Sequence, residues 1–192
     1  MLPEPIKNLV DQLAQLPSIG PRQAIRLAFH IKNRGDSAVE QLASSIAGLA
    51  KLKTCPSCFL VHESGNSAGL CHICDNPQRD PKLVAVVEKE TDLISLERTQ
   101  RYGGRYLILG ELKKDGSLSI EQKARLASIK DAEEIILGIS PTTFGDLNVA
   151  FINQELKNSA KKITRLGRGL PTGGEIEFAD DETLGSALEN RN

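Results

Sequence analysis

The chain has few aromatic residues and no tryptophan. Five phenylalanines and two tyrosines make up 4% of its 192 residues. Modules that bind nucleic acid by stacking bases on aromatic side chains, such as RRM and OB-fold domains, need more rings than this. The composition therefore argues against a base-stacking platform.

Long apolar runs are also missing. No stretch reaches the roughly 18 apolar residues that a membrane span requires. The N-terminus carries Pro3, Glu4 and Pro5 and lacks the basic start and apolar core of a secretion signal. We therefore expect a cytoplasmic protein without a membrane partner. Its apolar content of 40% is enough for one core or two small ones.

Cysteine is scarce, and its four copies form a single pattern. Cys55, Cys58, Cys71 and Cys74 form two pairs, each with two residues between its members and with twelve residues between the pairs. Four thiolates suit the tetrahedral coordination of Zn²⁺, and a site closed by four protein ligands is structural rather than catalytic. The pattern predicts one structural zinc ion per chain.

Two disulfides or a redox-active cysteine pair are the alternatives to zinc. Two disulfides would need an oxidising compartment, which the missing secretion signal argues against. A redox-active cysteine pair would not need a second pair. His62 and His72 are near enough in sequence to replace a cysteine ligand, but four thiolates already complete the site. Pro56 and Gly69 favour the tight turns that such a module uses.

Charge is divided unevenly along the chain. Residues 1–54 contain seven basic and four acidic residues, a net charge of +3. Residues 172–192 contain one arginine and six acidic residues, a net charge of −5. This division favours a polyanion contact at the first end and a protein or subunit contact at the other. An ordinary solvated surface is the alternative.

The first third of the chain has helical periodicity. Apolar residues recur at helical spacing over 6–16, 24–31 and 39–52. A segment rich in proline and glycine, 17–21, separates the first two helices. We expect Asp36 or Ser37 to cap the third.

From residue 82 onward the pattern changes to alternating strands and helices. Such alternation predicts a parallel α/β sheet. The expected strands are 83–87, 106–109, 134–139 and 162–166, and the expected helices are 90–101, 119–130, 145–158 and 180–189. The glycine-rich loop 167–174 lacks the lysine of a P-loop, so we expect its glycines to permit close approach of chains, as at a subunit contact.

The segment between the first two helices resembles a helix-hairpin-helix motif, 16–24. Such a hairpin presents backbone N–H groups and the positive end of a helix to a phosphate. Pro21 suits the first turn, and Arg22 and Arg26 lie one turn apart. Together they predict DNA binding without base recognition. Ser18 stands where the hairpin usually has glycine. A plain connection with exposed arginines is the alternative.

The whole order of modules resembles the RecR family of bacterial recombination mediators. The segments that carry this resemblance are the hairpin, the cysteine module, residues 163–175, and the pattern 178–184. The resemblance implies an α/β fold with four modules: a helix-hairpin-helix arm (1–53), a zinc finger (54–78), a Toprim domain (80–175) and an acidic helical tail that serves as a subunit contact (176–192).

The resemblance also implies a function and partners. Members of the family assemble as dimers or ring-like tetramers and, with RecO and sometimes RecF, help load RecA on single-stranded DNA at gaps. They act in the cytoplasm, on the nucleoid. Arg22 and Arg26 fall at the DNA-contacting positions of the family's hairpin, and Lys32 and Arg34 are weaker candidates.

The Toprim resemblance raises the question of catalysis. Catalytic Toprim enzymes hold Mg²⁺ with a glutamate after the first strand and an Asp-x-Asp pair after a later strand. Here Glu88 supplies the glutamate, but the later segment, 140–146, contains only Asp146, and Phe144 stands where relatives usually have glutamate. We therefore expect no enzyme, and we interpret Glu88 and Asp146 as a vestigial or partner-binding acidic site.

Two further observations complete the comparison with the family pattern. The segment 110–118 lacks the glycine- and proline-containing loop that the family usually has there. Two rival functions remain open at this point. One is a Mg²⁺-dependent nuclease or primase that uses Glu88 and Asp146, and the other is a zinc adaptor that binds only proteins.

Overall fold

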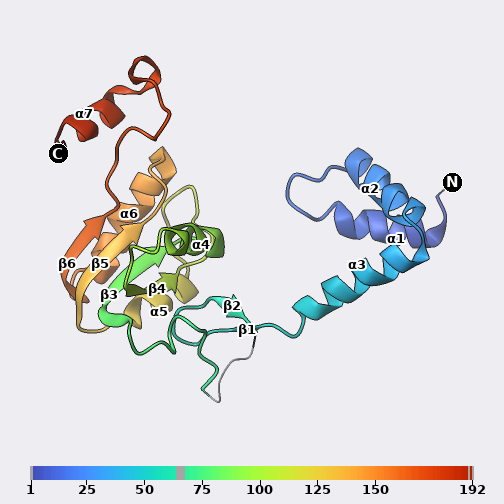
Figure 1. The fold of residues 1–192 in the computed structure, drawn as a ribbon, viewed down its shortest axis with the longest axis horizontal. Coiled ribbons are helices and arrows are strands. Elements are labelled where there is room, and N and C mark those ends of the chain that lie inside the picture. Colours follow the sequence, from blue (N-terminus) through green and yellow to red (C-terminus); the bar gives the residue numbers. More distant parts are fainter. Residues whose placement is uncertain (1, 64–67, 190, 192) are drawn as a thin grey trace. The chain divides into compact units, whose positions relative to one another are not determined.

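The computed structural model describes residues 2–63, 68–189 and 191. The chain divides into two compact units, an N-terminal unit (Met1–Leu52) and a C-terminal unit (Lys53–Asn192), drawn in Figure 1. Part of the expected zinc finger, residues 64–67, lies outside the described residues. In the described part of the chain, no helix is both long enough and apolar enough to cross a membrane.

Three helices form the N-terminal unit: α1 (Glu4–Leu13), α2 (Pro21–Asn33) and α3 (Asp36–Leu49). Helices α1 and α2 pack around a small core of Val10, Ala24 and Ala28. The small alanine side chains of α2 let the two helices approach closely. Helix α3 has no fully buried residue, and only Ala38, Val39 and Gly48 of this helix are partly buried.

The expected cap of α3 is wrong. Gly35, with a φ of 92°, occupies the N-cap position, where no side chain caps the helix. Glycine adopts this left-handed conformation without a steric penalty. Asp36 is instead the first helical residue, and its carboxylate accepts a hydrogen bond from Lys32 Nζ at 2.6 Å.

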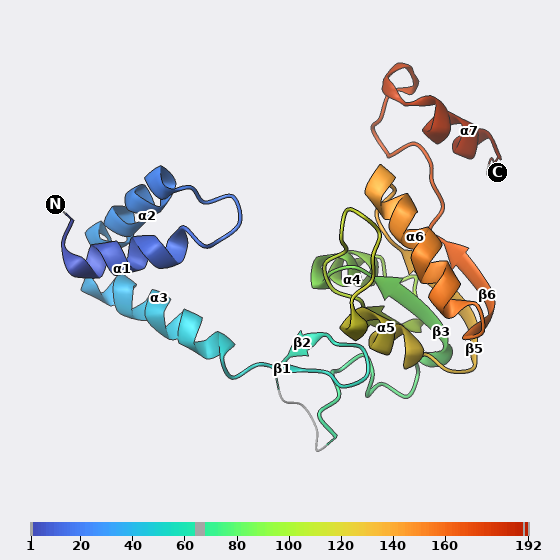
Figure 2. The ribbon, with the colours of Figure 1, turned by 180° about the vertical axis from the view of Figure 1, so that it is seen from behind.

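A four-stranded parallel sheet is the centre of the C-terminal unit, as predicted. Its strand order is β4-β3-β5-β6. The strands are β3 (Asp80–Val87), β4 (Gly104–Ile108), β5 (Ala132–Gly138) and β6 (Ala160–Arg165), and all neighbours are parallel. The helices α4 (Glu90–Arg98), α5 (Ile120–Ala127) and α6 (Thr143–Leu156) connect them, as Figure 2 shows from behind.

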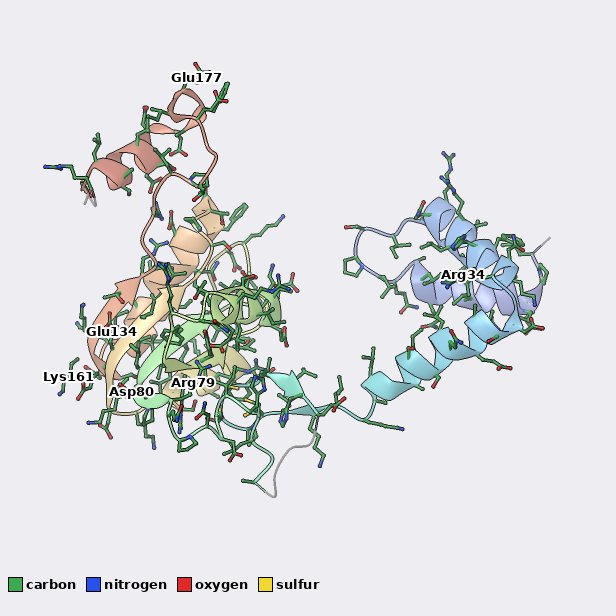
Figure 3. All side chains as sticks on the ribbon, viewed as in Figure 1. Arg34, Arg79, Asp80, Glu134, Lys161 and Glu177 are labelled. Atoms are coloured by element: carbon green, nitrogen blue, oxygen red, sulfur yellow. The ribbon has the colours of Figure 1, made fainter. Side chains whose placement is uncertain are left out.

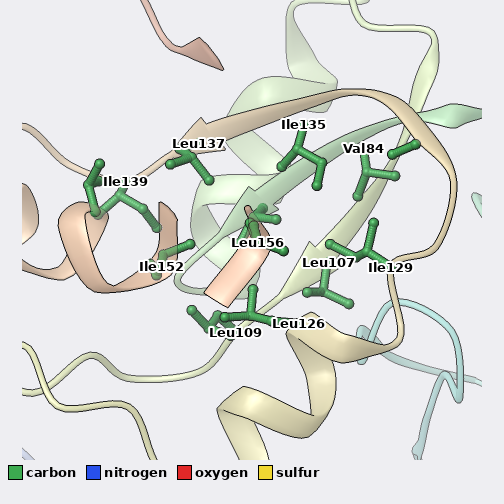
Figure 4. Packing of buried hydrophobic residues seen from close by; sticks show 13 residues of the cluster. Val84, Leu107, Leu109, Leu126, Ile129, Ile135, Leu137, Ile139, Ile152 and Leu156 are labelled. Carbon is green, nitrogen blue, oxygen red and sulfur yellow. The ribbon is translucent and has the colours of Figure 1, made fainter. Parts of the chain in front are cut away.

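The two faces of the sheet bury different cores. Alternate strand residues point to opposite faces. On one face, strand residues such as Val86 and Leu137 pack against Leu126 of α5 and Ile152 of α6, in the cluster drawn in Figure 4. On the other face, strand residues including Val87 pack against α4 and the four cysteines. The sheet therefore carries α5 and α6 on one side, and α4 and the cysteine module on the other.

Several boundaries differ from the predicted ones. The helix expected over 90–101 ends at Arg98, because Gln100 adopts a φ of 54°, and the helix expected over 119–130 ends at Ala127. Helix α6 begins two residues early because Thr142 Oγ1 accepts a hydrogen bond from the Gly145 N–H at 3.0 Å. All four strands begin with polar or small residues, which apolar patterning does not detect.

Two short elements were not expected. Strands β1 (Lys53–Thr54) and β2 (Val61–His62) pair antiparallel in the cysteine module. A 3₁₀ turn, η1 (Ile176–Phe178), precedes the expected C-terminal helix, α7 (Asp181–Glu189).

Candidate metal centre and nucleic-acid interface

The four cysteines lie together in the C-terminal unit. Their sulfur atoms are all within 4.8 Å of one another, and all four residues are buried. A tetrahedral zinc site with bonds of ~2.3 Å has sulfur–sulfur edges of about 3.8 Å. The thiol cluster therefore has the size and donor set that Zn²⁺ requires.

Backbone turns hold the thiols in place. The Phe59 N–H donates to the Cys55 carbonyl at 3.0 Å, and Phe59 itself has a φ of 66°. The Cys71 N–H points to the Cys55 sulfur at 3.5 Å. Gly69 has a φ of 70°, in keeping with the turn expected there. N–H groups directed at a sulfur stabilise a thiolate, as a metal ligand needs.

The disulfide alternative does not fit this cluster. All four cysteines are free, and the sulfur atoms of Cys58 and Cys71 are 3.4 Å apart, well beyond the ~2.05 Å of a disulfide. Hydrogen bonding from Cys58 lowers the pKa of Cys74 to about 5, whereas hydrogen bonding to Cys74 and burial raise the pKa of Cys58.

Neither histidine replaces a cysteine. His62 Nε2 lies 3.1 Å from the carbonyl oxygen of Gly69, and His72 is exposed. Among the described residues, only the four cysteines form a group that could hold a metal ion.

Hydrogen bonds and a cation–π contact, in addition to the covalent chain, join the cysteine module to the sheet and to α5. The Ile108 N–H of β4 donates to the Cys58 carbonyl at 2.9 Å. The Arg125 guanidinium of α5 lies 4.3 Å from the centre of the Phe59 ring and donates to the Ile108 carbonyl at 3.0 Å. The thiols also share a core with the sheet, so the packing of the cysteine module and of the sheet is interdependent.

The hairpin of the N-terminal unit spans the residues between α1 and α2. Ser18 has a φ of 64°, the conformation that glycine usually supplies in such hairpins. Helix α2 then begins with Pro21 in its first turn, as expected, and Gly20 is its N-cap. The first N–H groups of a helix have no intrahelical acceptor, so they remain available to an anion.

The four predicted DNA-binding residues separate into two groups. Arg22 and Arg26 are exposed on the first two turns of α2. Lys32 and Arg34 lie at its other end, ten or more residues and therefore about 15 Å away from Arg22. Lys32 is paired with Asp36, whereas Arg34 (labelled in Figure 3) forms the C-cap and is exposed.

The two acidic residues of the α/β body contact different partners. Glu88 follows β3, and its carboxylate accepts a hydrogen bond from the Leu112 N–H at 3.2 Å. Asp146, in the first turn of α6, accepts hydrogen bonds from Arg165 and Arg168, each at 2.6 Å. The Arg165 guanidinium, followed by Arg168, lowers the pKa of Asp146.

A cavity of about 760 Å³ lies beside Asp146, at the carboxyl ends of β5 and β6. Arg165, Arg168 and residues of the C-terminal segment line it, and Glu88 does not. A magnesium ion at Asp146 would have to compete with two arginine cations.

Two of the three departures from the family pattern lie next to each other. Phe144, on α6, and the segment 110–118 are in contact, because the Lys114 ammonium lies 5.7 Å from the centre of the Phe144 ring. Asn148, one turn after Phe144, donates from Nδ2 to the Lys113 carbonyl at 2.8 Å. The sequence shows both departures but not their proximity.

Arg165 and Arg168 are the site residues that the sequence prediction missed. Their only signal was their place in a segment typical of the family, 163–175. The carboxylate they contact lies about twenty residues earlier in the chain, so only the parallel sheet brings them together.

Comparison with known proteins agrees with this arrangement. The family model described as "RecR, helix-hairpin-helix" matches residues 6–49, the Toprim domain model matches 82–167, and the model described as "RecR, C-terminal" matches 169–192. Recombination protein RecR of Rippkaea orientalis is 40% identical over 100% of this chain and 98% of its own length. This chain belongs to the RecR family.

Other RecR proteins are similarly close. Recombination protein RecR of Frankia casuarinae is 36% identical over 97% of this chain and 95% of its own length. The protein of the same name from Synechocystis is 38% identical over 97% of this chain and 82% of its own. The RecR family supports a role in DNA repair and recombination, and the predicted order of hairpin, cysteine cluster, Toprim domain and C-terminal helix is confirmed.

Proposed function

We propose that this protein is a non-catalytic recombination mediator that holds DNA through the start of α2. The supporting observation is the arrangement of the hairpin. Ser18 adopts a left-handed turn, α2 begins at once, and Arg22 and Arg26 are exposed beside the free N–H groups of its first turn. Phosphates bound there would be neutralised without any contact to base edges.

The proposed partners extend this role. RecO, and RecF in some settings, would bring the protein to gapped DNA, where the complex would help load RecA on single strands. The protein would act in the cytoplasm, on the nucleoid. The names of the relatives support the recombination role. The acidic C-terminal segment, and Glu88 and Asp146 at separate positions of the α/β body, would supply carboxylates for protein contacts.

A structural zinc ion would be held by Cys55, Cys58, Cys71 and Cys74. The donor set and the distances between sulfurs support this proposal. The ion would supply no chemistry beyond cross-linking the two cysteine pairs, because four thiolates leave no open coordination position. It would stabilise a small module that could not bury enough apolar surface alone.

Self-association would make DNA binding multivalent. Helix α3 leaves Leu42, Ile46 and Leu49 exposed on one face, and Ile176 and Phe178 are 68% and 80% exposed in the acidic C-terminal segment. Apolar faces of this kind fit contacts between copies, in a dimer or a ring-like tetramer. Several weak hairpins would then bind one DNA with a higher effective concentration.

Fluorescence anisotropy on gapped DNA across a salt series tests the DNA contact. The Arg22→Ala, Arg26→Ala variant should bind more than tenfold more weakly at low salt, and the slope of log affinity against log salt should fall by about two for each subunit that contacts the DNA. The Lys32→Ala, Arg34→Ala variant is the matched control, because it removes the same charge from the other end of α2.

The control should lose much less affinity, since Lys32 is already paired with Asp36. Equal losses in the two variants would mean that net charge, not the hairpin, drives binding. If the wild type binds no DNA even with RecO added, the protein-only adaptor becomes the better reading. Mg²⁺-dependent cleavage or priming lost in Glu88→Gln would instead establish an enzyme.

A further inference from the structure

The outer face of α6 carries three large apolar side chains. Phe144, Leu147 and Phe151 are 51%, 41% and 41% exposed. Their spacing of three and four residues places them on one side of the helix. Other residues of α6 pack into the core, so this helix is apolar on both sides. Scattered exposed apolar residues are ordinary, but a continuous stripe of them marks an interaction site.

The loop between β4 and α5 packs along this stripe, beside α6 in Figure 2. A Cβ atom added to Gly116 would lie 2.8 Å from Phe151 and 2.9 Å from Leu147, so glycine permits a close approach at a φ of 78°. Asn148 anchors the loop by donating to the Lys113 carbonyl. The loop thus supports the stripe without covering it.

The same loop places two cations at the edge of the stripe. The Lys114 ammonium lies over the Phe144 ring, and Lys113 precedes it. Within the described residues neither lysine forms an ion pair. The nearby carboxylate of Asp115 is held by the N–H and hydroxyl of Ser117, at 2.9 and 2.8 Å. The second acidic residue of the loop, Glu111, precedes Leu112, which packs against the core.

We propose that this surface, formed by Phe144, Leu147 and Phe151 with Lys113 and Lys114, docks an acidic, apolar peptide segment of a partner protein. Apolar side chains of the segment would cover the stripe, and its carboxylates would meet the two lysines. A nucleic acid fits less well, because the stripe offers phosphates no donors and only its edge is charged. The surface shares no residue with the proposed DNA contact, so the two proposals fail separately.

Binding of short labelled peptides to the full-length, zinc-loaded protein tests this. The first peptide carries leucine, phenylalanine and isoleucine at helical spacing with several aspartates. The second replaces the aspartates by lysines, and the third replaces the apolar residues by serines. The first should bind at least about tenfold more tightly than either control, because it alone matches both the stripe and the lysines.

Two variants locate the contact. Phe144→Ser with Leu147→Ser should weaken binding of the first peptide about tenfold or more. Lys113→Ala with Lys114→Ala should weaken it at low salt and flatten its salt dependence. Ile94→Ser, which removes a 46% exposed apolar residue of α4, and Lys130→Ala, which removes an exposed lysine, are the matched controls and should change nothing. Circular dichroism verifies that each variant is folded.

Three results would overturn the proposal. The first is equal binding of all three peptides, or of none. The second is a loss of affinity in the controls that matches the loss in the stripe variants. The third is a change in sedimentation of the Phe144→Ser, Leu147→Ser protein, which would assign the stripe to a contact between copies of the chain.

Discussion

Replacing Glu97 by glutamine should destabilise the C-terminal unit and remove part of its sensitivity to acid. Glu97 of α4 accepts two hydrogen bonds from Arg79, which Figure 3 labels beside Asp80, at 2.8 and 2.6 Å. The side chain of Glu97 is 25% exposed and that of Arg79 is 17% exposed. Arg79 also donates to the carbonyls of Tyr102 and Gly104, at 3.0 and 3.3 Å. The pair thus joins the start of β3 to α4 and to the segment before β4.

The burial of this pair sets the size of the effect. Exposed ion pairs contribute about 0.2–1 kcal/mol, whereas breaking a buried pair costs about 3–5 kcal/mol. For a partly buried pair with two charge-assisted hydrogen bonds, we expect Glu97→Gln to cost about 2 kcal/mol. Arg79→Met should cost about 3 kcal/mol, because two backbone carbonyls also lose their donor.

The pH dependence has a definite sign. The hydrogen bonds from Arg79 lower the pKa of Glu97 from 4.5. A carboxyl whose pKa is lower in the folded state stabilises the fold above its unfolded pKa and loses that contribution as the pH falls through the folded one. The stability difference between wild type and Glu97→Gln should therefore be constant from pH 7 to about 5 and shrink below about 4.5.

Urea unfolding followed by tyrosine fluorescence measures this directly. Tyr102 and Tyr106 are the only tyrosines, tryptophan is absent, and the two rings lie 4.9 Å apart in the C-terminal unit. The signal therefore reports on this unit alone. A double-mutant cycle of Arg79→Met and Glu97→Gln at pH 7 should give a coupling energy of about 1.5–2 kcal/mol.

The pair Lys82–Glu133 is the control for this cycle. Its atoms are 3.4 Å apart and its side chains are 60% and 54% exposed, so its coupling should stay below about 0.5 kcal/mol. A coupling for Arg79 and Glu97 as small as that of the control would refute the reasoning. A stability difference that does not change below pH 4.5 would also refute it.

Two further predictions concern the metal and the hairpin. Removing zinc with a chelator should lower the melting temperature reported by tyrosine fluorescence, because the thiols share a core with Val87 and Ile108. A colorimetric zinc indicator verifies that all of the metal has been released. An unchanged melting temperature after complete release would contradict a structural site. Ser18→Gly should stabilise the N-terminal unit by about 0.5–1 kcal/mol, because glycine adopts the φ of 64° without the steric penalty of serine. Thermal unfolding followed by the helical circular dichroism signal measures this change in stability. Ser37→Gly is the control: because residue 37 lies within α3, where glycine is unfavourable, this variant should have a lower melting temperature.

Much of the fold was predictable because it depends on short-range patterns. Strand–helix alternation predicted the parallel sheet, and the breaks at proline and glycine predicted the hairpin. Boundaries were less accurate where local backbone geometry decides them. Gln100 adopts a positive φ just after α4 ends, and Gly35 displaces Asp36 as the cap of α3. Propensity alone does not reveal such choices, since the same residues also fit a helix.

The amino-acid sequence by itself determined the kind of chemistry available: four thiols with zinc spacing, two arginines after a hairpin, and an incomplete set of Toprim carboxylates. Only the tertiary structure decided which of these groups act together. It pairs Lys32 with Asp36, pairs Asp146 with Arg165 at the end of β6 and with Arg168 just beyond it, and sets Lys114 over Phe144. The physical reason is that spacing along a chain specifies local geometry, whereas charges and apolar surfaces from distant segments meet only when the sheet packs.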